Sequence, residues 1–251
     1  MMTVRTYYFS WRKLFIIAAV MLLVFGFTGF SIFERYHTTV AAGGVEPIFQ
    51  GNTGTKAVAI TINVDWGEEF IPAMLQEFKK NNAQVTFFVT GKWAEKNPEL
   101  LKQMASAGHS IQNHGYRHCH FNQLSANEVC TEIKKAEDII SKITGQPSTF
   151  FAPPYGEYNS QLVSTVNGIN YKYIMWSADT IDWQRPDATT IVNRVMKKLH
   201  NDVIILMHPT GPTLKALPEM LKQLQAQNYQ MISIDKITAG KVEAGNETKN
   251  G

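Results

Sequence analysis

Residues 57–65, "AVAITINVD", form an apolar run that ends at a carboxylate. Thr61, Ile62 and Val64 are β-branched, which favours a buried strand over 57–64. The stretch Asp65 to Glu69 then carries three carboxylates within five residues. Carboxylates so close to the end of a strand indicate either a solvated loop or a reactive site.

The pattern of a short apolar run followed by an amphipathic stretch recurs along the chain. Six further runs predict strands over 84–89, 109–113, 149–152, 171–178, 203–207 and 230–234. The stretches between them predict helices over 70–81, 97–107, 126–143, 159–167, 188–199 and 214–227. Alternating strands and helices indicate βα units and a parallel sheet. With seven strands and no glycine-rich nucleotide motif, we expect an α/β fold that closes as a barrel rather than an open doubly wound sheet.

The N-terminus predicts a membrane anchor. Residues 14–33 are twenty uncharged, mostly apolar residues, enough for a helix that crosses a hydrocarbon core of about 30 Å. Basic residues precede this run, so we expect residues 1–13 to be cytoplasmic and the rest of the chain to face outward from the cell membrane. The alternative is a cleaved signal peptide, because "VAA" at 40–42 resembles a cleavage site.

The sequence after the predicted anchor indicates one domain with a flanking segment on each side. The composition of residues 34–55 is typical of a linker and that of residues 239–251 of a disordered tail, which leaves a domain over 56–238. The net charge of +3 is scattered without a long basic run, so nucleic acid is not an expected partner. Cys119 and Cys130 are too few for a disulfide framework and are not spaced as a metal or redox pair.

Reactive side chains follow five of the predicted strands. In parallel βα folds the loops at the carboxyl ends of the strands share one rim, where sites are built. The residues that this placement brings to one rim are Asp65, His114, His118, Tyr155, Asp179, Asp182 and His208.

Two histidines in "NHGYRH" point to a metal. The four-residue spacing of His114 and His118 places both imidazoles on one side of a helical turn, within reach of one ion. With Asp65 they would leave a position open for water, which is the catalytic arrangement, whereas a structural zinc has four ligands. The alternative is an accidental spacing of surface histidines.

The predicted strand over 203–207 ends in the motif "ILMHP", which contains His208. An aspartate on the adjacent strand end would raise the pKa of His208 and suit it to act as a general acid. Of Asp179 and Asp182, one is expected to serve in helix capping or turn chemistry instead. The turn "FAPPYGEYN" offers a backbone N–H near Tyr155 to an oxyanion, although this ring can equally be a packing residue.

The motifs "NHGYRH", "PPYG", "WSADTIDW" and "ILMHP", in this order, make the chain from about 57 to 235 resemble the polysaccharide deacetylases with a NodB-homology domain, particularly the branch of spore-forming bacteria. The resemblance implies a deformed (β/α) barrel that binds Zn²⁺ or another divalent metal such as Co²⁺, Ni²⁺ or Mn²⁺. It also implies hydrolysis of N-acetyl, sometimes O-acetyl, groups on a sugar polymer.

The resemblance assigns a role to each candidate residue. By position, the metal ligands are Asp65, His114 and His118, the catalytic acid is His208 with Asp179 as its charge partner, the oxyanion donor is Tyr155, and the substrate-binding residues are Asp182, Trp183 and Leu206.

Two positions depart from the family pattern. Two neighbouring aspartates usually follow the first strand, the first of them as general base, but here Asn63 stands in the place of the base. An amide can orient a water molecule but cannot accept its proton. The arginine that usually pairs with the base is Ala152. The two losses are coherent, because an arginine without its aspartate would be an unpaired charge.

Replacements for these groups are conceivable within the sequence. Glu68, Glu69 or Glu157 could supply a base. If Asp65 itself became the base, the metal would lose a carboxylate, which Cys119 or His120 could replace only if the "HCH" turn permits.

Three functions remain open. The first is a membrane-anchored, metal-dependent deacetylase of an extracytoplasmic N-acetylated glycan, with peptidoglycan as the obvious candidate and a role in sporulation suggested by the resemblance. The second is a catalytically silent glycan-binding protein that keeps the fold and the metal. The third is a metal hydrolase of another small acyl substrate.

Overall fold

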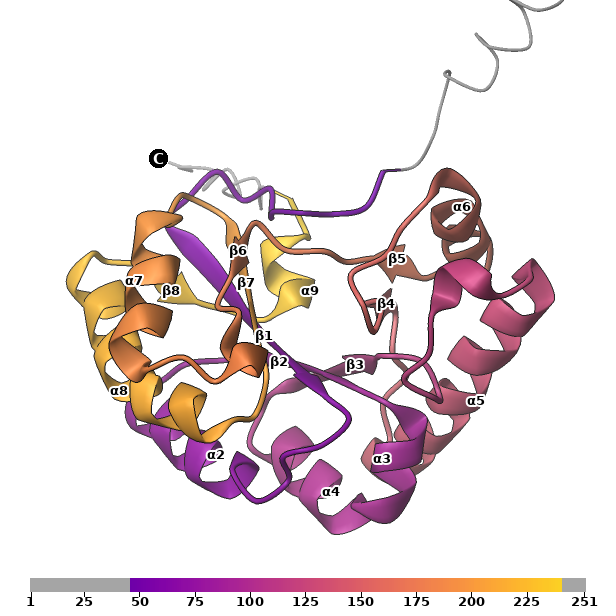
Figure 1. Ribbon diagram of the computed structural model, residues 1–251, viewed down its shortest axis with the longest axis horizontal. Coiled ribbons are helices and arrows are strands. Elements are labelled where there is room, and N and C mark those ends of the chain that lie inside the picture. The colour runs from indigo at the N-terminus through magenta and orange to yellow at the C-terminus, as the bar shows by residue number, and fades with distance from the viewer. Residues whose placement is uncertain (1–45, 241–251) are drawn as a thin grey trace, which may run out of the picture. The chain divides into compact units, whose positions relative to one another are not determined.

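A computed structural model describes residues 46–240 of the chain, whose strands form one curled parallel sheet (Figure 1). The strands are β1 (Ala57–Val64), β2 (Thr86–Val89), β3 (Ser110–Asn113), β4 (Phe150–Phe151), β5 (Lys172–Tyr173), β6 (Ala178–Asp179), β7 (Val203–Met207) and β8 (Gln230–Met231). Their order is β5-β4-β3-β2-β1-β7-β6, and β8 pairs with β1. The expected parallel α/β architecture is therefore confirmed as a curled half-barrel.

Most of the helices surround the outer side of the sheet, while the short last helix packs inside its curl (Figure 1). The α-helices are α2 (Ile71–Lys80), α3 (Gly91–Lys96), α4 (Pro98–Ser106), α5 (Ala126–Thr144), α6 (Ser160–Gly168), α7 (Ala188–Lys197), α8 (Gly211–Ala226) and α9 (Ile234–Ile237), with 3₁₀ turns η1 (Phe121–Gln123) and η2 (Asp182–Gln184). A capping box starts α5, in which the side chains of Ser125 and Glu128 each accept the backbone N–H of the other residue.

The central strand β1 is buried along its whole length, with its two faces in different clusters. Val58 and Ile60 pack in the large cluster beneath the outer helices. Ala57 and Ala59 pack in a second cluster with Phe88 of β2, on the inner side of the curled sheet. Because side chains alternate between the faces of a strand, positions 61 and 63 also point inward, toward the candidate site.

The sheet has a seam between β5 and β6, which no ladder joins in the described residues. An N-terminal segment crosses this seam: Ile48 bridges to Ile174 after β5, and Gln50 bridges to Val203 at the start of β7. The interpretation of 34–55 as a linker is therefore wrong for its described part, which pairs with the sheet. The ordered domain begins before the predicted boundary at residue 56.

Two of the predicted strands differ from the structure. The run 171–178 is interrupted and forms the short strands β5 and β6, which lie on opposite sides of the seam. The run 230–234 leaves the sheet after Met231, because Ser233 starts helix α9. Helix α3 was not predicted, since six residues are too few to show a helical period.

Several sequence predictions lie outside the described residues. These are the anchor at 14–33, the cytoplasmic segment 1–13 and the tail from 241 onward. Among residues 46–240, no helix is both long and apolar enough to cross a membrane.

Candidate functional site

A cleft of about 460 Å³ lies at the carboxyl ends of the strands. It is lined by seven of the ten predicted site residues, namely Asn63, His118, Tyr155, Asp179, Trp183, Leu206 and His208. These side chains come from the ends of β1, β3, β4, β6 and β7 and from the loops that follow them. The prediction that separate loops deliver reactive groups to one rim is therefore confirmed.

A larger hollow of about 980 Å³ lies at the opposite ends of the strands, where it is lined by Phe78, His109 and Tyr229. His109 is buried there, and burial lowers its pKa to about 4. Among the residues that line this hollow, His109 and Lys79 are the charged or readily titrating groups, and no cluster of acids and bases forms. The cleft at the carboxyl ends is therefore the candidate site.

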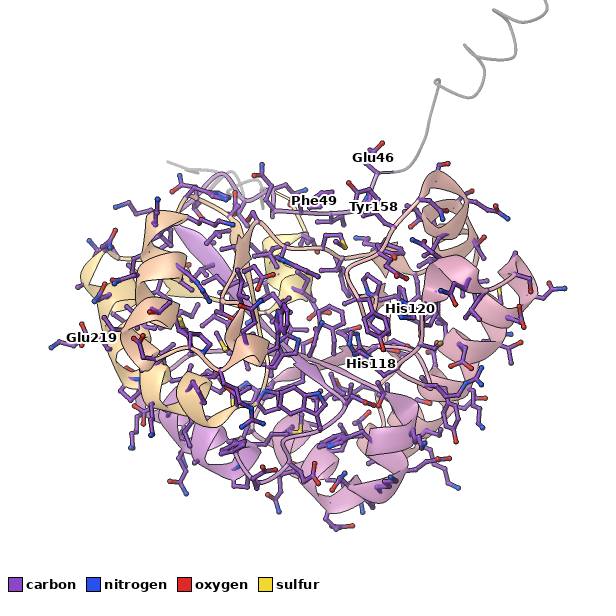
Figure 2. The ribbon with its side chains drawn as sticks, in the orientation of Figure 1. Glu46, Phe49, His118, His120, Tyr158 and Glu219 are labelled. Atoms are coloured by element: carbon purple, nitrogen blue, oxygen red, sulfur yellow. The ribbon has the colours of Figure 1, made fainter. Side chains whose placement is uncertain are left out.

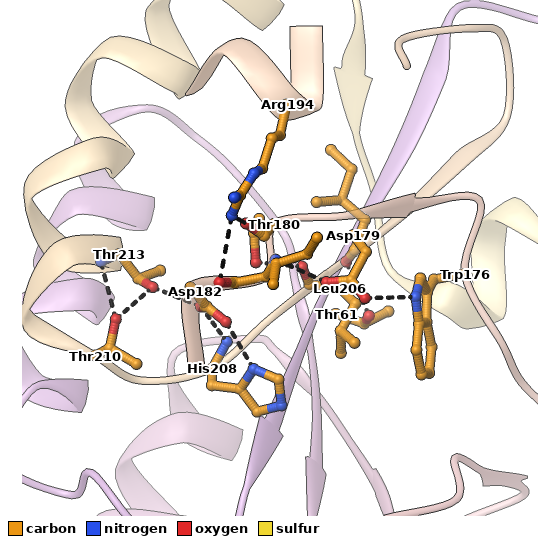
Figure 3. Close-up of polar contacts among 12 residues, drawn as sticks. Thr61, Trp176, Asp179, Thr180, Asp182, Arg194, Leu206, His208, Thr210 and Thr213 are labelled. Atoms are coloured by element: carbon orange, nitrogen blue, oxygen red, sulfur yellow. Dashed lines mark hydrogen bonds and ion pairs between the residues drawn. The ribbon is translucent and has the colours of Figure 1, made fainter. Parts of the chain in front are cut away.

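His208 forms a hydrogen-bonded pair with a buried aspartate (Figure 3). Its Nδ1 lies 2.7 Å from Oδ1 of Asp182, and its backbone N–H donates to Oδ2 of the same carboxylate at 2.6 Å. The hydroxyl of Thr213 donates to that oxygen at 2.5 Å. Because an ionised carboxylate only accepts hydrogen bonds, the proton of a neutral His208 ring resides on Nδ1. The lone pair of Nε2 is then free to act in the cleft.

The aspartate beside His208 is not the predicted one. Asp179 instead accepts the backbone N–H of Ile181 at 2.8 Å and the indole N–H of Trp176 at 3.2 Å. The expectation that one of the two aspartates serves a turn is thus met by Asp179. Asp182 is fully buried, so its assignment to substrate binding is also wrong. Its carboxylate is occupied by three protein donors and does not reach the cleft surface.

An unusual backbone conformation brings Asp182 toward His208. Ile181 has a φ of 51°, in the left-handed region that β-branched residues rarely occupy. The Asp179 carboxylate holds its N–H, while Arg194 donates to the carbonyl of Thr180 at 2.8 Å (Figure 3). Such a conformation persists only where surrounding contacts enforce it. The loop is therefore built to direct the Asp182 carboxylate inward.

The two histidines of "NHGYRH" lie next to each other, and His118 lines the cleft. Their ring centroids lie 5.4 Å apart, and Nδ1 of His114 lies 2.7 Å from the carbonyl oxygen of Ala152. Burial lowers the pKa of His114 well below its ordinary value, with the neighbouring His118 as a further cause. Burial also lowers the pKa of His118, against the opposing effect of Asp65. Both rings are therefore neutral near pH 7, and Nε2 of His114 carries a lone pair.

The third predicted metal ligand does not complete this pair. One carboxylate oxygen of Asp65 accepts the hydroxyl of Thr90 at 2.7 Å. Within residues 46–240, no group of three or more His, Cys, Asp or Glu side chains is placed to hold a metal ion. The predicted ligand set of Asp65, His114 and His118 is thus not assembled. The donor chemistry of two neutral imidazoles suits a metal, but the three-ligand site does not fit.

Asn63 contributes an unsatisfied polar atom to the cleft. Its side chain is 4% exposed, and its Oδ1 has no hydrogen-bond partner in the described protein. An unpaired buried acceptor of this kind costs about 1–3 kcal/mol. Ala152 is also buried, in the apolar cluster that includes Ile174 and Ile204. Apolar packing therefore occupies the place of the family's arginine.

The conceivable replacement bases Glu68, Glu69 and Glu157 are not among the residues that line the cleft. Glu68 is exposed and lies 3.4 Å from the indole N–H of Trp93 on α3. Glu157 lies 2.7 Å from Nδ1 of His120, which stacks on the ring of Tyr155 at a centroid distance of 3.9 Å. His118 and His120 both lie on the chain between β3 and α5 (Figure 2). Neither glutamate lines the cleft, so neither takes the place of the missing base.

Sequence reasoning missed one aromatic contact of the site. The indole of Trp66 lies parallel to the His208 ring, with an interplanar angle of 6° and a centroid distance of 6.1 Å. Trp66 directly follows Asp65, and this position beside a predicted ligand was the only sequence signal for it. The supporting residues Thr213 and Arg194 gave no signal, because they lie on helices far along the chain.

Comparisons with known proteins agree with this geometry. The polysaccharide deacetylase family model matches residues 50–174. The uncharacterized protein YlxY of Bacillus subtilis is 34% identical over 76% of this chain, which spans 60% of YlxY. The peptidoglycan-N-acetylglucosamine deacetylase of Bacillus cereus is 31% identical, with 74% of this chain and 70% of the relative covered.

Similar solved structures include one of a protein described as a pseudoenzyme. The crystal structure of wild-type BA3943 from Bacillus anthracis, described as a CE4 family pseudoenzyme, has a TM-score of 0.74 and 36% identity, over 76% of this chain and 68% of that one. A BA3943 mutant described as having restored enzymatic activity matches with a TM-score of 0.74, 35% identity and coverages of 76% and 71%.

Proposed function

We propose, since the chain belongs to the polysaccharide deacetylase family, that its cleft binds an N-acetylated cell-wall glycan without hydrolysing the acetyl groups. Relatives are named for deacetylating N-acetylglucosamine or N-acetylmuramic acid of peptidoglycan, which supports peptidoglycan as the ligand. BA3943, a relative of similar identity, is described as a pseudoenzyme.

The observation that carries the proposal is the unpaired amide oxygen of Asn63. It is buried in a cleft with reactive groups around it, where an acetamide N–H or a sugar hydroxyl can donate to it. The same amide cannot accept a proton from water at physiological pH. A residue that can bind the glycan but cannot act as a base therefore occupies the position of the general base.

Two further features of the site support loss of turnover. Ala152 leaves no cation to pair with a base at position 63, and its surroundings are apolar. No three-ligand group is placed for a metal in the described residues, although His114 and His118 are neutral and adjacent. A base at position 63 and its arginine partner at position 152 are thus both lacking in one site.

A second candidate is the metal-dependent N-deacetylase, and the pairing of His208 with Asp182 favours it. Glycan binding alone has no need of a histidine held by a buried carboxylate and Thr213. In this candidate His208, when protonated, donates its Nε2 proton to the departing amine of the sugar. Zn²⁺ or another divalent metal would require Asp65 to join the two imidazoles, which it does not do in the structure.

The proposed location is the outer face of the cell membrane, with residues 14–33 as the anchor, and it rests on the sequence alone. A role in sporulation rests only on the resemblance to the spore-former branch. Secretion after cleavage at residues 40–42 is the alternative, which size analysis of the cell-associated protein would reveal.

The two candidates are separated by measuring binding and acetate release in the same sample. Zinc is added to a protein that comprises residues 45–251. This protein is then mixed with N-acetylglucosamine tetramer in one sample and with peptidoglycan in another. Binding without acetate release is the expected result. Acetate release that disappears in His208→Ala, with the fold intact, would instead support the deacetylase and overturn the proposal.

A further inference from the structure

We propose that Trp66 is a stacking platform for a second sugar unit, so that the cleft recognises a glycan chain rather than a single N-acetylated sugar. This inference rests on the proposed function and names the form of ligand that the same site takes. Sugar rings present apolar C–H faces, which pack on aromatic rings, and their hydroxyls bond to nearby polar groups.

The position of Trp66 is fixed by the residue that follows it. Gly67 has a φ of +84°, and a Cβ atom there would collide with the backbone carbonyl of Pro209. The loop after β1 is thereby pressed against the loop after β7. Trp66 is held at the rim by this close approach of the two loops rather than by burial of its indole.

The indole presents a surface to the cleft that the protein does not use. One side of Trp66 lies parallel to the His208 ring, yet the residue remains 39% exposed and lines the cleft. Within residues 46–240, its Nε1–H makes no hydrogen bond, whereas the indole N–H groups of Trp93 and Trp176 both find carboxylates. A free apolar face beside a free donor suits a sugar ring with its hydroxyls.

The exposed aromatic residues of the described domain gather at this cleft. Four large hydrophobic side chains are exposed among residues 46–240, and Trp66, Tyr155 and Trp183 line the cleft. The fourth, Tyr158, packs on Phe49 instead (Figure 2). Exposed aromatic surface concentrated at one cleft marks a ligand-binding surface. The three rings come from three different loops, which fits a ligand with more than one ring.

Asn63 and Trp66 lie at different depths in the cleft, and this difference separates the positions of two linked sugar rings. Asn63 is almost completely buried at the end of β1, so an acetamide that reaches its Oδ1 occupies the floor of the cleft. Trp66 lies three residues further along, at the exposed rim beside His208. A sugar joined to the one whose acetamide is bound is therefore the ring that meets Trp66.

The test compares single and linked sugars on matched variants of residues 45–251, which include the complete core described above. N-acetylglucosamine monomer and tetramer are titrated calorimetrically into the parent, Trp66→Ala, Trp66→Phe and Tyr158→Ala. We expect Trp66→Ala to weaken tetramer binding about tenfold and to leave monomer binding unchanged. Trp66→Phe should restore most of the loss, and Tyr158→Ala, an exposed aromatic outside the cleft, should have no effect.

Each other outcome contradicts a different statement. Unchanged tetramer binding by Trp66→Ala, or an equal loss for monomer and tetramer, overturns the inference while the proposed function stands. A parent that binds neither sugar overturns the proposed function and the inference with it. Thermal unfolding of each variant shows whether a loss of binding comes from a loss of fold.

Discussion

Nδ1 of His208 and Oδ1 of Asp182 lie 2.7 Å apart, although the two residues are 26 positions apart in sequence. The same carboxylate also takes the His208 backbone N–H and the Thr213 hydroxyl. The pair thus fixes both the ring tautomer and the end of β7, and through Thr213 it joins η2 and β7 to the first turn of α8.

Replacing Asp182 should disturb both stability and the His208 ring. In Asp182→Asn the charge-assisted hydrogen bonds are lost, and the new NH₂ group faces donors, so we expect a loss of about 2–3 kcal/mol in the free energy of unfolding. The downfield Nδ1–H resonance of His208 should vanish in proton NMR. Asp179→Asn is the matched control and should cost about 1 kcal/mol while the resonance remains. If the control rather than Asp182→Asn removed the signal, the observed pairing would be contradicted.

Zinc should bind weakly and through the histidines. Two imidazoles without a third ligand predict a dissociation constant in roughly the micromolar range or weaker. His118→Ala should weaken binding at least about tenfold, whereas Asp65→Asn should change it less than about threefold because Asp65 does not complete a three-ligand group with the two histidines in the described residues. Calorimetric zinc titrations measure both effects. Equal losses in the two variants would mean that all three side chains ligate the metal in solution.

Activity should require two substitutions together. Ala152→Arg alone places a guanidinium in an apolar cluster and should destabilise the fold by about 3 kcal/mol. Asn63→Asp supplies the missing base, and its carboxylate gives the arginine a partner, so the double variant should release acetate from peptidoglycan with zinc present. Asn63→Leu with Ala152→Arg is the control that lacks a base. An active parent, or an equally active control, would contradict the assigned cause of inactivity.

His109 should make the domain sensitive to mild acid. It lies between the edges of Phe78 and Phe87, and its folded pKa of about 4 is below the ordinary 6.5. The unfolded state therefore takes up the proton first as the pH falls. This contribution to stability is complete above pH 6.5 and is lost toward pH 4, by about 2 kcal/mol between pH 6.5 and pH 5.

Urea unfolding at these two pH values measures the effect. His109→Gln keeps an acceptor for the backbone N–H of Val85 but does not titrate, so its stability should fall less over this interval. The difference in pH dependence between the parent and His109→Gln gives the contribution of His109 separately from that of other histidines. A variant with the same pH dependence as the parent would show that His109 is not responsible.

The fold could be predicted where local sequence determines it. The bounds of β1 and β7 match the prediction, because both strands are continuous apolar runs. The run 171–178 was misread as one strand, because its apolar residues pack at a seam that is closed by Ile48 from a distant segment. The pattern of apolar residues indicates only that a segment is buried. A segment that is buried at the seam shows the same pattern as a strand that is hydrogen-bonded within the sheet.

The site could be predicted as a set of positions but not as a set of contacts. Asp179 and Asp182 both come at the end of the same predicted strand. Because sites form at the carboxyl ends of parallel strands, both residues were predicted to lie at the rim. Which of them turns toward His208 depends on the left-handed backbone of Ile181, and nothing about an isoleucine signals that conformation. Asp65 was predicted beside the histidines, whereas the structure shows its carboxylate accepting the hydroxyl of Thr90, at the start of a helix too short to predict.

The most direct test of the central claim is one titration of N-acetylglucosamine tetramer into the parent domain at pH 7 with zinc, in which heat of binding and free acetate are measured together. The account predicts saturable binding that Asn63→Leu weakens, with no acetate above the protein-free control. Catalytic release of acetate by the parent would contradict it, as would the absence of any binding.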